Sequence, residues 1–286
     1  MKDDPQVQRA VSQYQLGLPR SPVAGRAGEL LGRGTGSSLE FLEHREYAPG
    51  DDVRHLDWAA YARSDALMVR LYREEISPRL EILLDASRSM TSGPEGIKSR
   101  LACQLAAMFG LLSGQTGGRP VIRVMDDSAK FPALELGELQ LLSKLDFAGR
   151  ETLPNLLAQR RFPLSRQSVR IVISDFLFPC DPAGLIRRLA SDASVLWVVQ
   201  VLHGWEADPR PMGGRRLIDV ETRSELNLML NPQTIERYRQ RLAALQAELM
   251  RQCRRAHASF VTVTADDGLD RICRESLCPP GILRAG

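Results

Sequence analysis

The sequence lacks paired cysteine motifs, phosphate-binding loops and long apolar runs, and each absence argues against a class of protein. Its five cysteines are odd in number and contain no CxxC pair, which is typical of free thiols in a reducing compartment. Neither GxGxxG nor GxxxxGK[ST] occurs, which argues against ATP binding by a P-loop. Apolar runs such as residues 195–202 are less than half the ~20 residues that cross a bilayer.

A strong charge of one sign is also missing. The chain has 38 basic and 35 acidic residues, and this net charge of +3 is too small to indicate a nucleic-acid or membrane partner by itself. The first residues, MKDDPQVQRAVSQYQLG, place acids beside the only early lysine and contain no apolar stretch of the secretory kind. We therefore expect a cytoplasmic protein with no membrane span, whose partners are determined by specific sites.

The chain does have enough apolar material for a sizeable core, with 43% apolar residues among 286. Residues 1–36 end in the glycine-rich string GRGTG and predict a partly ordered, flexible N-terminal arm. Residues 37–78 contain short, turn-punctuated pieces with period-two alternation at Met68–Tyr72, and predict a small β-rich subdomain packed on the main domain. The main domain is expected over residues 79–286.

In the main domain, short β-rich runs are separated mostly by helical patterns. This alternation is typical of crossover units that build a mainly parallel sheet with helices on its faces. Apolar stripes that start at Ile97 and Ile235 mark the two clearest helices, and Gly114 is the predicted stop of the first. The predicted strands cover residues 80–84, 121–125, 169–174, 194–202 and 259–264. The predicted fold class is therefore α/β, with a doubly wound sheet.

Oxygen-bearing side chains follow two of these strands. The stretch ILLDASRSM carries Asp85, Ser87 and Ser89 after a buried strand, Asp175 follows the strand over 169–174, and Thr152 begins a helical pattern. In doubly wound folds, ligands bind where the carboxyl ends of parallel strands meet. A donor set of oxygens without His or Cys favours a hard divalent ion, Mg²⁺ or Mn²⁺. The alternative for each residue is a helix cap or turn, and a cap contributes roughly 0.5–2 kcal/mol.

The string REYAPGDDVRHLDW concentrates charge, and we interpret it as structural. Pro49-Gly50 favours a tight turn, the arginines are available to pair with nearby carboxylates, and Trp58 is a plausible anchor into the core. A partner-facing surface is the alternative. The residues of this structural or partner surface are Arg45, Asp51, Asp52, Arg54, Asp57, Trp58 and Arg63.

Two further charged segments have structural interpretations. Asp126-Asp127 could add carboxylates to a two-metal nuclease site, but the flanking apolar pieces favour the turn of a β-hairpin. The arginines of the helix over 232–257 are interrupted by Glu236 and Glu248 and lack interleaved aromatics, so a solvated face is favoured over nucleic-acid binding.

These motifs carry a family resemblance. DASRSM, with Thr152 and Asp175 downstream, resembles the metal-ion-dependent adhesion site of von Willebrand factor A domains, whose pattern is DxSxS, then Thr, then Asp. REYAPGDDVRHLDW is similar to the signature of the bacterial family called "domain of unknown function fifty-eight". The resemblance implies a von Willebrand factor A-like fold in which the Ser87 and Ser89 hydroxyls contact the ion directly. Thr152 would contact it directly or through water. Asp85 and Asp175 would act mostly through water or by orienting the hydroxyls.

The resemblance also implies a partner. The family is linked with MoxR-type AAA+ ATPases, and one metal position would remain for a carboxylate from the ATPase or its client. The expected function is therefore a non-enzymatic, chaperone-like, metal-dependent protein-interaction module. The alternatives are a metal-dependent hydrolase, either phosphatase or nuclease, and a metal-free scaffold. Aspartyl phosphatases carry a second Asp where this chain has Ser87, and the loop GRETL departs from the glycine-rich form common around the Thr of adhesion domains.

Overall fold

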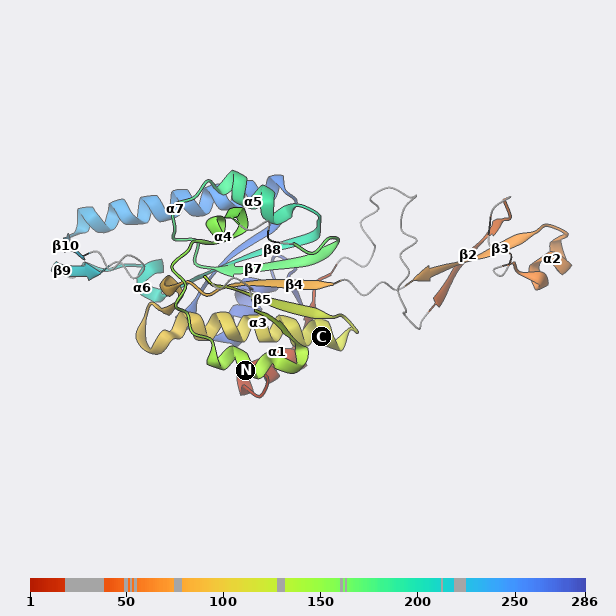
Figure 1. The fold of residues 1–286 in the computed structure, drawn as a ribbon, viewed down its shortest axis with the longest axis horizontal. Helices are drawn as coiled ribbons and strands as arrows, with labels where there is room; N and C mark the ends of the chain where they lie inside the picture. The colour runs from red at the N-terminus through yellow and green to blue at the C-terminus, as the bar shows by residue number, and fades with distance from the viewer. Residues whose placement is uncertain are drawn as a thin grey trace. The chain divides into compact units, whose positions relative to one another are not determined.

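Figure 1 shows the computed structural model of the chain, which divides into two compact units. One unit covers residues 24–77, and the other combines residues 1–23 with residues 78–286. The structure describes residues 1–18, 39–48, 51, 53, 56–74, 79–127, 132–159, 162, 164–211, 213–218 and 225–286.

The larger unit contains a six-stranded sheet in the order β11-β8-β7-β4-β5-β6. Five strands are parallel, and only the edge strand β6 runs antiparallel to its neighbour β5. The strands are β4 (Leu80–Asp85), β5 (Pro120–Met125), β6 (Ala133–Glu135), β7 (Ser168–Ser174), β8 (Ala193–Leu202) and β11 (Ser259–Thr264). The predicted α/β class, with a mostly parallel sheet flanked by helices, is confirmed.

Helices cover both faces of this sheet (Figure 1). One face packs against α1 (Pro5–Gln13), α3 (Ile97–Gln115) and α8 (Leu269–Ile272), and the other against α4 (Leu153–Gln159), α5 (Pro182–Ala190) and α7 (Pro232–Arg255). Successive strand residues alternate between the two cores: Ile82 and Leu84 join the first, and Leu83 joins the second. Because both faces are covered, the central strands are mostly apolar on both faces, as in Ile82–Leu84 of β4.

Local sequence explains where three of these helices begin. Asp4, Asp181 and Asn231 each cap a helix through a side-chain oxygen that accepts backbone N–H groups, and a proline follows each of them. Helix α3 ends at Gln115, so it runs through the predicted stop at Gly114. A single glycine costs a helix only about 1 kcal/mol, which the burial of this helix outweighs.

The N-terminal residues differ from the prediction of a flexible arm over 1–36. Residues 5–13 form α1, and β1 (Tyr14–Leu16) pairs antiparallel with β12 (Leu283–Ala285). Val7, Ala10 and Val11 are buried in the same core as α3, because their three- and four-residue spacing places them on one helical face. Residues 19–36 lie outside the described residues.

The smaller unit contains a β-hairpin and a short helix. Strand β2 (Leu39–Glu46) pairs antiparallel with β3 (Met68–Glu74), and α2 (Trp58–Ser64) lies between them in the sequence. The Asp57 carboxylate caps α2 by accepting the N–H groups of Ala59 and Ala60. The prediction that Trp58 anchors into the core is wrong. Its side chain is 65% exposed at the first turn of α2, where its ring meets that of Tyr61 edge-on.

Part of the charged string pairs as predicted. The Arg45 guanidinium contacts the Asp51 carboxylate at 2.7 Å, and the same carboxylate accepts the N–H of Ala48. The Ala48 hydrogen bond, with a smaller contribution from Arg45, holds the pKa of Asp51 below its usual value. Arg63 is exposed in the last turn of α2. The remaining members of the string, Asp52 and Arg54, lie outside the described residues.

Candidate metal centre

The strand order reverses at β4, which has β5 on one side and β7 on the other. In doubly wound sheets, this switch point opens a crevice at the carboxyl ends of the strands, where ligands bind. Asp85 is the last residue of β4, and Asp175 comes directly after β7. Because β4 and β7 are parallel neighbours, both carboxylates leave the sheet at the same end.

Asp85 orients the loop that follows it. Its carboxylate is buried and accepts two hydrogen bonds, from the Ser87 backbone N–H at 2.9 Å and from the Ser174 hydroxyl at 2.5 Å. The first bond turns the chain so that the hydroxyl oxygens of Ser87 and Ser89 lie 3.1 Å apart. The two predicted hydroxyl ligands therefore lie side by side, with Asp85 behind them.

The loop that leads to Thr152 lies against the same segment. Gly149 forms a parallel bridge with Ser87, accepting the Arg88 N–H at 2.9 Å and donating to the Ala86 carbonyl at 3.1 Å. A Cβ at Gly149 would lie 3.0 Å from the Ala86 oxygen, so a residue without a side chain permits this close approach. Thr152 lies three residues after Gly149 and is half-buried. Its carbonyl accepts the Leu156 N–H in the first turn of α4.

One of the two aspartates that follow β5, Asp127, supports this loop. Strands β5 and β6 pair antiparallel, so the hairpin interpretation of Asp126-Asp127 is confirmed. The Asp127 carboxylate accepts the backbone N–H groups of Arg150 and Glu151 at 2.8–3.0 Å. Asp127 therefore holds the backbone of the two residues that precede Thr152.

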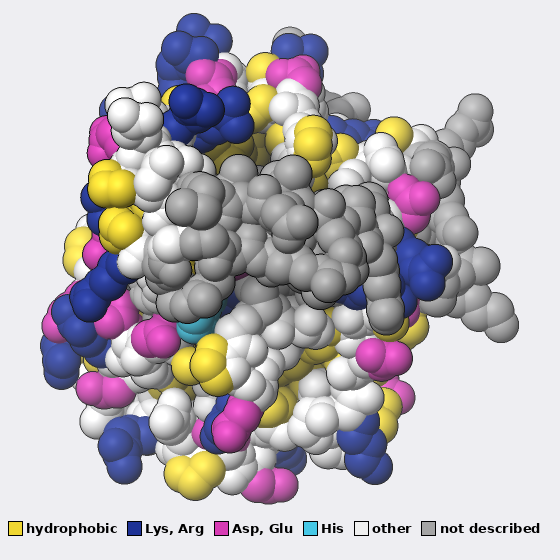
Figure 2. Space-filling view, turned by 90° about the vertical axis from the view of Figure 1, so that its left-hand side faces the viewer, with side chains coloured by type: hydrophobic (Ala, Val, Ile, Leu, Met, Phe, Trp, Pro, Cys, Tyr) yellow, Lys and Arg dark blue, Asp and Glu magenta, His cyan; other side chains and the backbone are white. Residues whose placement is uncertain are grey.

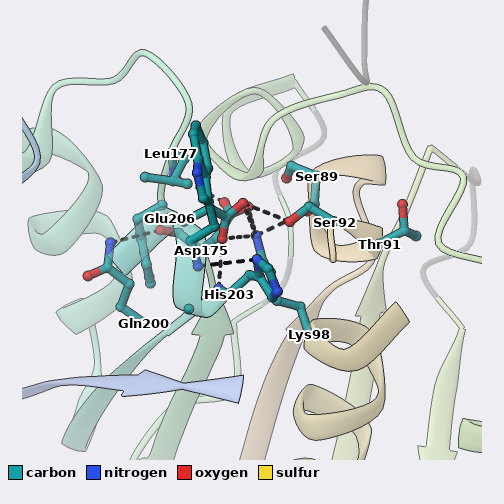
Figure 3. A network of polar contacts seen from close by, with 12 residues as sticks. Ser89, Thr91, Ser92, Lys98, Asp175, Leu177, Gln200, His203 and Glu206 are labelled. Atoms are coloured by element: carbon teal, nitrogen blue, oxygen red, sulfur yellow. Dashed lines mark hydrogen bonds and ion pairs between the residues drawn. The ribbon is translucent and has the colours of Figure 1, made fainter. Parts of the chain in front are cut away.

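Sequence reasoning missed Lys98 and Glu206, which lie at the centre of the polar network in Figure 3. The Lys98 ammonium, fully buried in the first turn of α3, lies 2.9 Å from Asp175 Oδ2 and 3.0 Å from Glu206 Oε1. It also donates to the Ser89 carbonyl at 3.1 Å. One ammonium group thus joins the loops after β4, β7 and β8.

Glu206 belongs to α6 (Gly204–Ala207), the short helix that follows β8. Its carboxylate also accepts the Ser92 hydroxyl at 2.7 Å and the His203 N–H at 2.8 Å. The sequence around Glu206 gives no signal of this role. A signal does exist for Lys98, because it stands at helical spacing ahead of Leu101 and Leu105 and so begins an apolar stripe with a charge.

Negative charge is in excess in this cluster. The Lys98 ammonium contacts the carboxylates of Asp175 and Glu206, and the Asp85 carboxylate lies near enough to Asp175 to feel its charge, so two negative charges remain when all four groups are ionised. Burial, and next the nearby charge of Asp175, raise the pKa of Asp85 to about 6, although hydrogen bonds from Ser174 and Ser87 act in the opposite direction.

Without metal, we expect the raised pKa of Asp85 to reduce stability as the pH rises. The folded state binds the proton more tightly than the unfolded state, so unfolding releases it between pH 4 and 6. The free energy of unfolding should fall across that interval by about 2 to 3 kcal/mol. Urea denaturation with chelator at several pH values measures this effect. Asp85→Asn should remove it, and Asp270→Asn, an exposed control, should not; an unchanged slope in Asp85→Asn would contradict the assignment.

The residues present fit a hard divalent ion. The adjacent hydroxyl oxygens are the kind of ligand that such an ion prefers. The excess of two negative charges matches the charge that it carries. Among the described residues, no group of three or more His, Cys, Asp or Glu side chains is arranged to hold a metal. The predicted direct ligands, Ser87 and Ser89, are hydroxyls and are not part of such a group.

The architecture so far defines a mixed α/β protein with a candidate ligand site at its switch point. A family model described as "Protein of unknown function DUF58" matches residues 43–248, and the chain belongs to this family. Uncharacterized proteins of Mycobacterium bovis and Mycobacterium tuberculosis are 26% identical over 275 residues, which are 92% of this chain and 86% of each relative.

Solved structures with a distant likeness also exist. An aerotolerance-related membrane protein from Bacteroides fragilis is 15% identical, with a TM-score of 0.41, over 69% of this chain and 98% of that one. The conserved hypothetical protein BatB from Bacteroides thetaiotaomicron is also 15% identical, with a TM-score of 0.36, over 65% of this chain and 90% of that one.

The expected cytoplasmic location is corrected by these comparisons. The Bacteroides fragilis protein is described as a membrane protein, and a third similar structure, from Vibrio fischeri, as a membrane-spanning protein. In the part of the chain that the structure describes, no helix is long and apolar enough to span a bilayer. The scarcity of long apolar runs does not establish a compartment, because association with a membrane does not require a span within the same chain.

Proposed function

We propose that this protein is a non-enzymatic, metal-dependent protein-interaction module with a von Willebrand factor A-like main domain. Mg²⁺ or Mn²⁺ would be held by the hydroxyls of Ser87, Ser89 and Thr152. One observation supports this most strongly: two adjacent hydroxyls and a net excess of buried negative charge lie at the switch point of a doubly wound sheet.

The protein's own residues would orient the site. Asp85 holds the Ser87 backbone, Lys98 holds Asp175 and the Ser89 carbonyl, and Gly149 brings the Thr152 loop against Ser87. When bound, the ion supplies a Lewis-acidic position for an additional oxygen ligand. A carboxylate from another protein suits that position, because it adds the charge that hydroxyl ligands lack.

A MoxR-type AAA+ ATPase, or its client, is the proposed source of that carboxylate. The family resemblance points to this class of partner. Such an ATPase would supply nucleotide hydrolysis, for which this chain has no phosphate-binding pattern. The proposed role is therefore to present or capture acidic segments during protein or complex maturation driven by the ATPase.

A metal-free scaffold is the second candidate, because Lys98 already neutralises part of the charge on Asp175 and Glu206. In that case the three loops would be held permanently by the ammonium and would bind partners through their surface alone. Dependence on a divalent ion separates the two candidates.

Capture of a co-expressed MoxR-type ATPase from the same genome tests the proposal. We expect the ATPase to co-purify with tagged protein in Mg²⁺ and to be lost in EDTA. Asp85→Ala should lose at least nine-tenths of the capture, because the loop it orients would no longer present the hydroxyls. Ser143→Ala, an exposed serine on the 136–144 helical segment, is the matched control. Capture by Asp85→Ala that is undiminished and insensitive to EDTA would rule the proposal out.

A further inference from the structure

Lys98 is a buried cation within the proposed divalent-ion site. Its side chain has no exposed surface, and it contacts a predicted metal-site residue, Asp175, and the backbone of another, Ser89. Its other partner, Glu206, is 15% exposed and comes from a loop that the metal motif does not include. Figure 3 shows the ammonium group between these loops.

We propose that Lys98 sets the charge of the site, so that it binds a divalent ion weakly by itself and tightly only together with a carboxylate. This inference rests on the proposed function. Three carboxylates and one ammonium leave two negative charges, which a divalent ion reduces to zero. A neutral loaded site accepts an incoming carboxylate without net repulsion. Without Lys98 the loaded site would keep one negative charge and would repel that carboxylate.

The electrostatic potential at the site is set by the buried charged groups around Lys98 and not by a patch of one charge on the described surface. Figure 2 shows the end of the larger unit that carries α6, and basic and acidic side chains are interspersed over its described surface. Lys98 and Asp175 have no solvent-exposed side-chain area, so salt screens their interaction much less than that of surface charges. A single charge at this position therefore has a large effect on any ion bound beside it.

The network also indicates a preformed site. Lys98 already holds the Ser89 carbonyl and Asp175, and Asp175 is fixed further by the N–H of Leu177 and, through its carbonyl, by Gln200. The ion would then not have to organise these loops. Its affinity should follow the net charge of the cluster more than the cost of ordering the chain.

Binding of Mn²⁺ to the full chain, followed by calorimetry and by the electron paramagnetic resonance of the free ion, tests the inference. Lys98→Met should bind Mn²⁺ at least ten times more tightly than the wild type, and Glu206→Gln at least ten times more weakly. The double variant, with the same net charge as the wild type, should return to within about three-fold of it. Lys144→Met, which removes an exposed lysine, should change nothing.

Acetate provides the second measurement, because it is the simplest carboxylate probe. In the wild type, acetate should tighten Mn²⁺ binding and Mn²⁺ should tighten acetate binding by the same factor. In Lys98→Met this coupling should disappear.

Equal Mn²⁺ affinity in the wild type and both single variants would overturn the inference and leave the proposed function standing. If the wild type itself binds no Mn²⁺, the proposed function fails, and the inference fails with it. Should Lys98→Met fail to fold, as judged by circular dichroism, Glu206→Gln decides the inference, since it keeps the ammonium and removes one negative charge.

Discussion

Ser87→Ala is expected to abolish the stabilisation that Mg²⁺ gives the wild-type protein. An ion that binds only the folded state raises the free energy of unfolding by about 2.7 kcal/mol when its concentration is 100 times its dissociation constant. The Ser87 hydroxyl is a proposed direct ligand and lies 3.1 Å from the other, Ser89. We therefore expect the melting temperature of Ser87→Ala to be the same in millimolar Mg²⁺ and in EDTA.

The fold of this variant should survive. The substitution keeps the backbone N–H of Ser87, which is the group that Asp85 holds, and keeps the bridge to Gly149. Loss of one hydroxyl hydrogen bond should cost the metal-free protein only about 1 kcal/mol. Thermal melts of wild type, Ser87→Ala and the exposed control Ser143→Ala, each with Mg²⁺ and with EDTA in the presence of acetate, which supplies the carboxylate that tight binding requires, provide the measurement. A full Mg²⁺ response in Ser87→Ala would remove this hydroxyl from the site, and no response in the wild type would favour the metal-free scaffold.

Glu81→Ala should be among the most destabilising single changes in the protein, and it should act at a distance from the candidate metal centre. Glu81 is buried near the amino end of β4 and pairs with Arg170 on β7 and Arg123 on β5. Its carboxylate also accepts the hydroxyl and the N–H of Ser165. Removing it leaves the fully buried guanidinium of Arg170 without its charge partner. Breaking a buried pair in this way typically costs 3–5 kcal/mol.

Urea denaturation measures that loss as a lowered midpoint. Glu275→Ala is the matched control: Glu275 also pairs with an arginine, Arg271, but both side chains are about half exposed. Exposed pairs contribute at most about 1 kcal/mol. Glu81→Gln should be intermediate, because its amide oxygen can still accept hydrogen bonds. A loss below 1 kcal/mol in Glu81→Ala would show that Arg170 is satisfied by its bonds to the Ser165, Leu189 and Ser191 carbonyls alone.

Much of the fold could be predicted because its signals are local. Apolar runs of strand length define β4 and β7, and the predicted bounds differ from the observed ones by one residue. The DxSxS stretch comes directly after an apolar run and was therefore placed at the end of a strand. Because the carboxyl ends of parallel strands lie at the same edge of a sheet, Asp85 and Asp175 were predicted to lie at one end. The pairing of Glu81 with Arg170 was not predicted, because it depends on the sheet register, which places the two residues directly opposite each other.

Other features depend on contacts between segments that are distant in the sequence. Trp58 was predicted to be buried because it is large and apolar, but burial depends on what packs beside a residue, and its side chain is exposed. The order of strands around β4 creates the switch point. This order depends on how all the strands and their connecting helices pack together, so it cannot be predicted from one segment of the sequence. Glu206 enters the site from 108 residues beyond Lys98, because the end of β8 lies beside that of β7.

The sequence by itself therefore determined the α/β class and the parallel strands of the sheet, and it supplied the proposed oxygen donors Asp85, Ser87, Ser89, Thr152 and Asp175, since strand length, periodicity and spacing are properties of neighbouring residues. Only the tertiary structure decided that β4 stands at the switch point and that Lys98 lies between the carboxylates of Asp175 and Glu206. The physical reason is that burial and charge pairing act through space. A lysine that looks like a solvated residue in a helix can become the central cation of a site once three loops close around it.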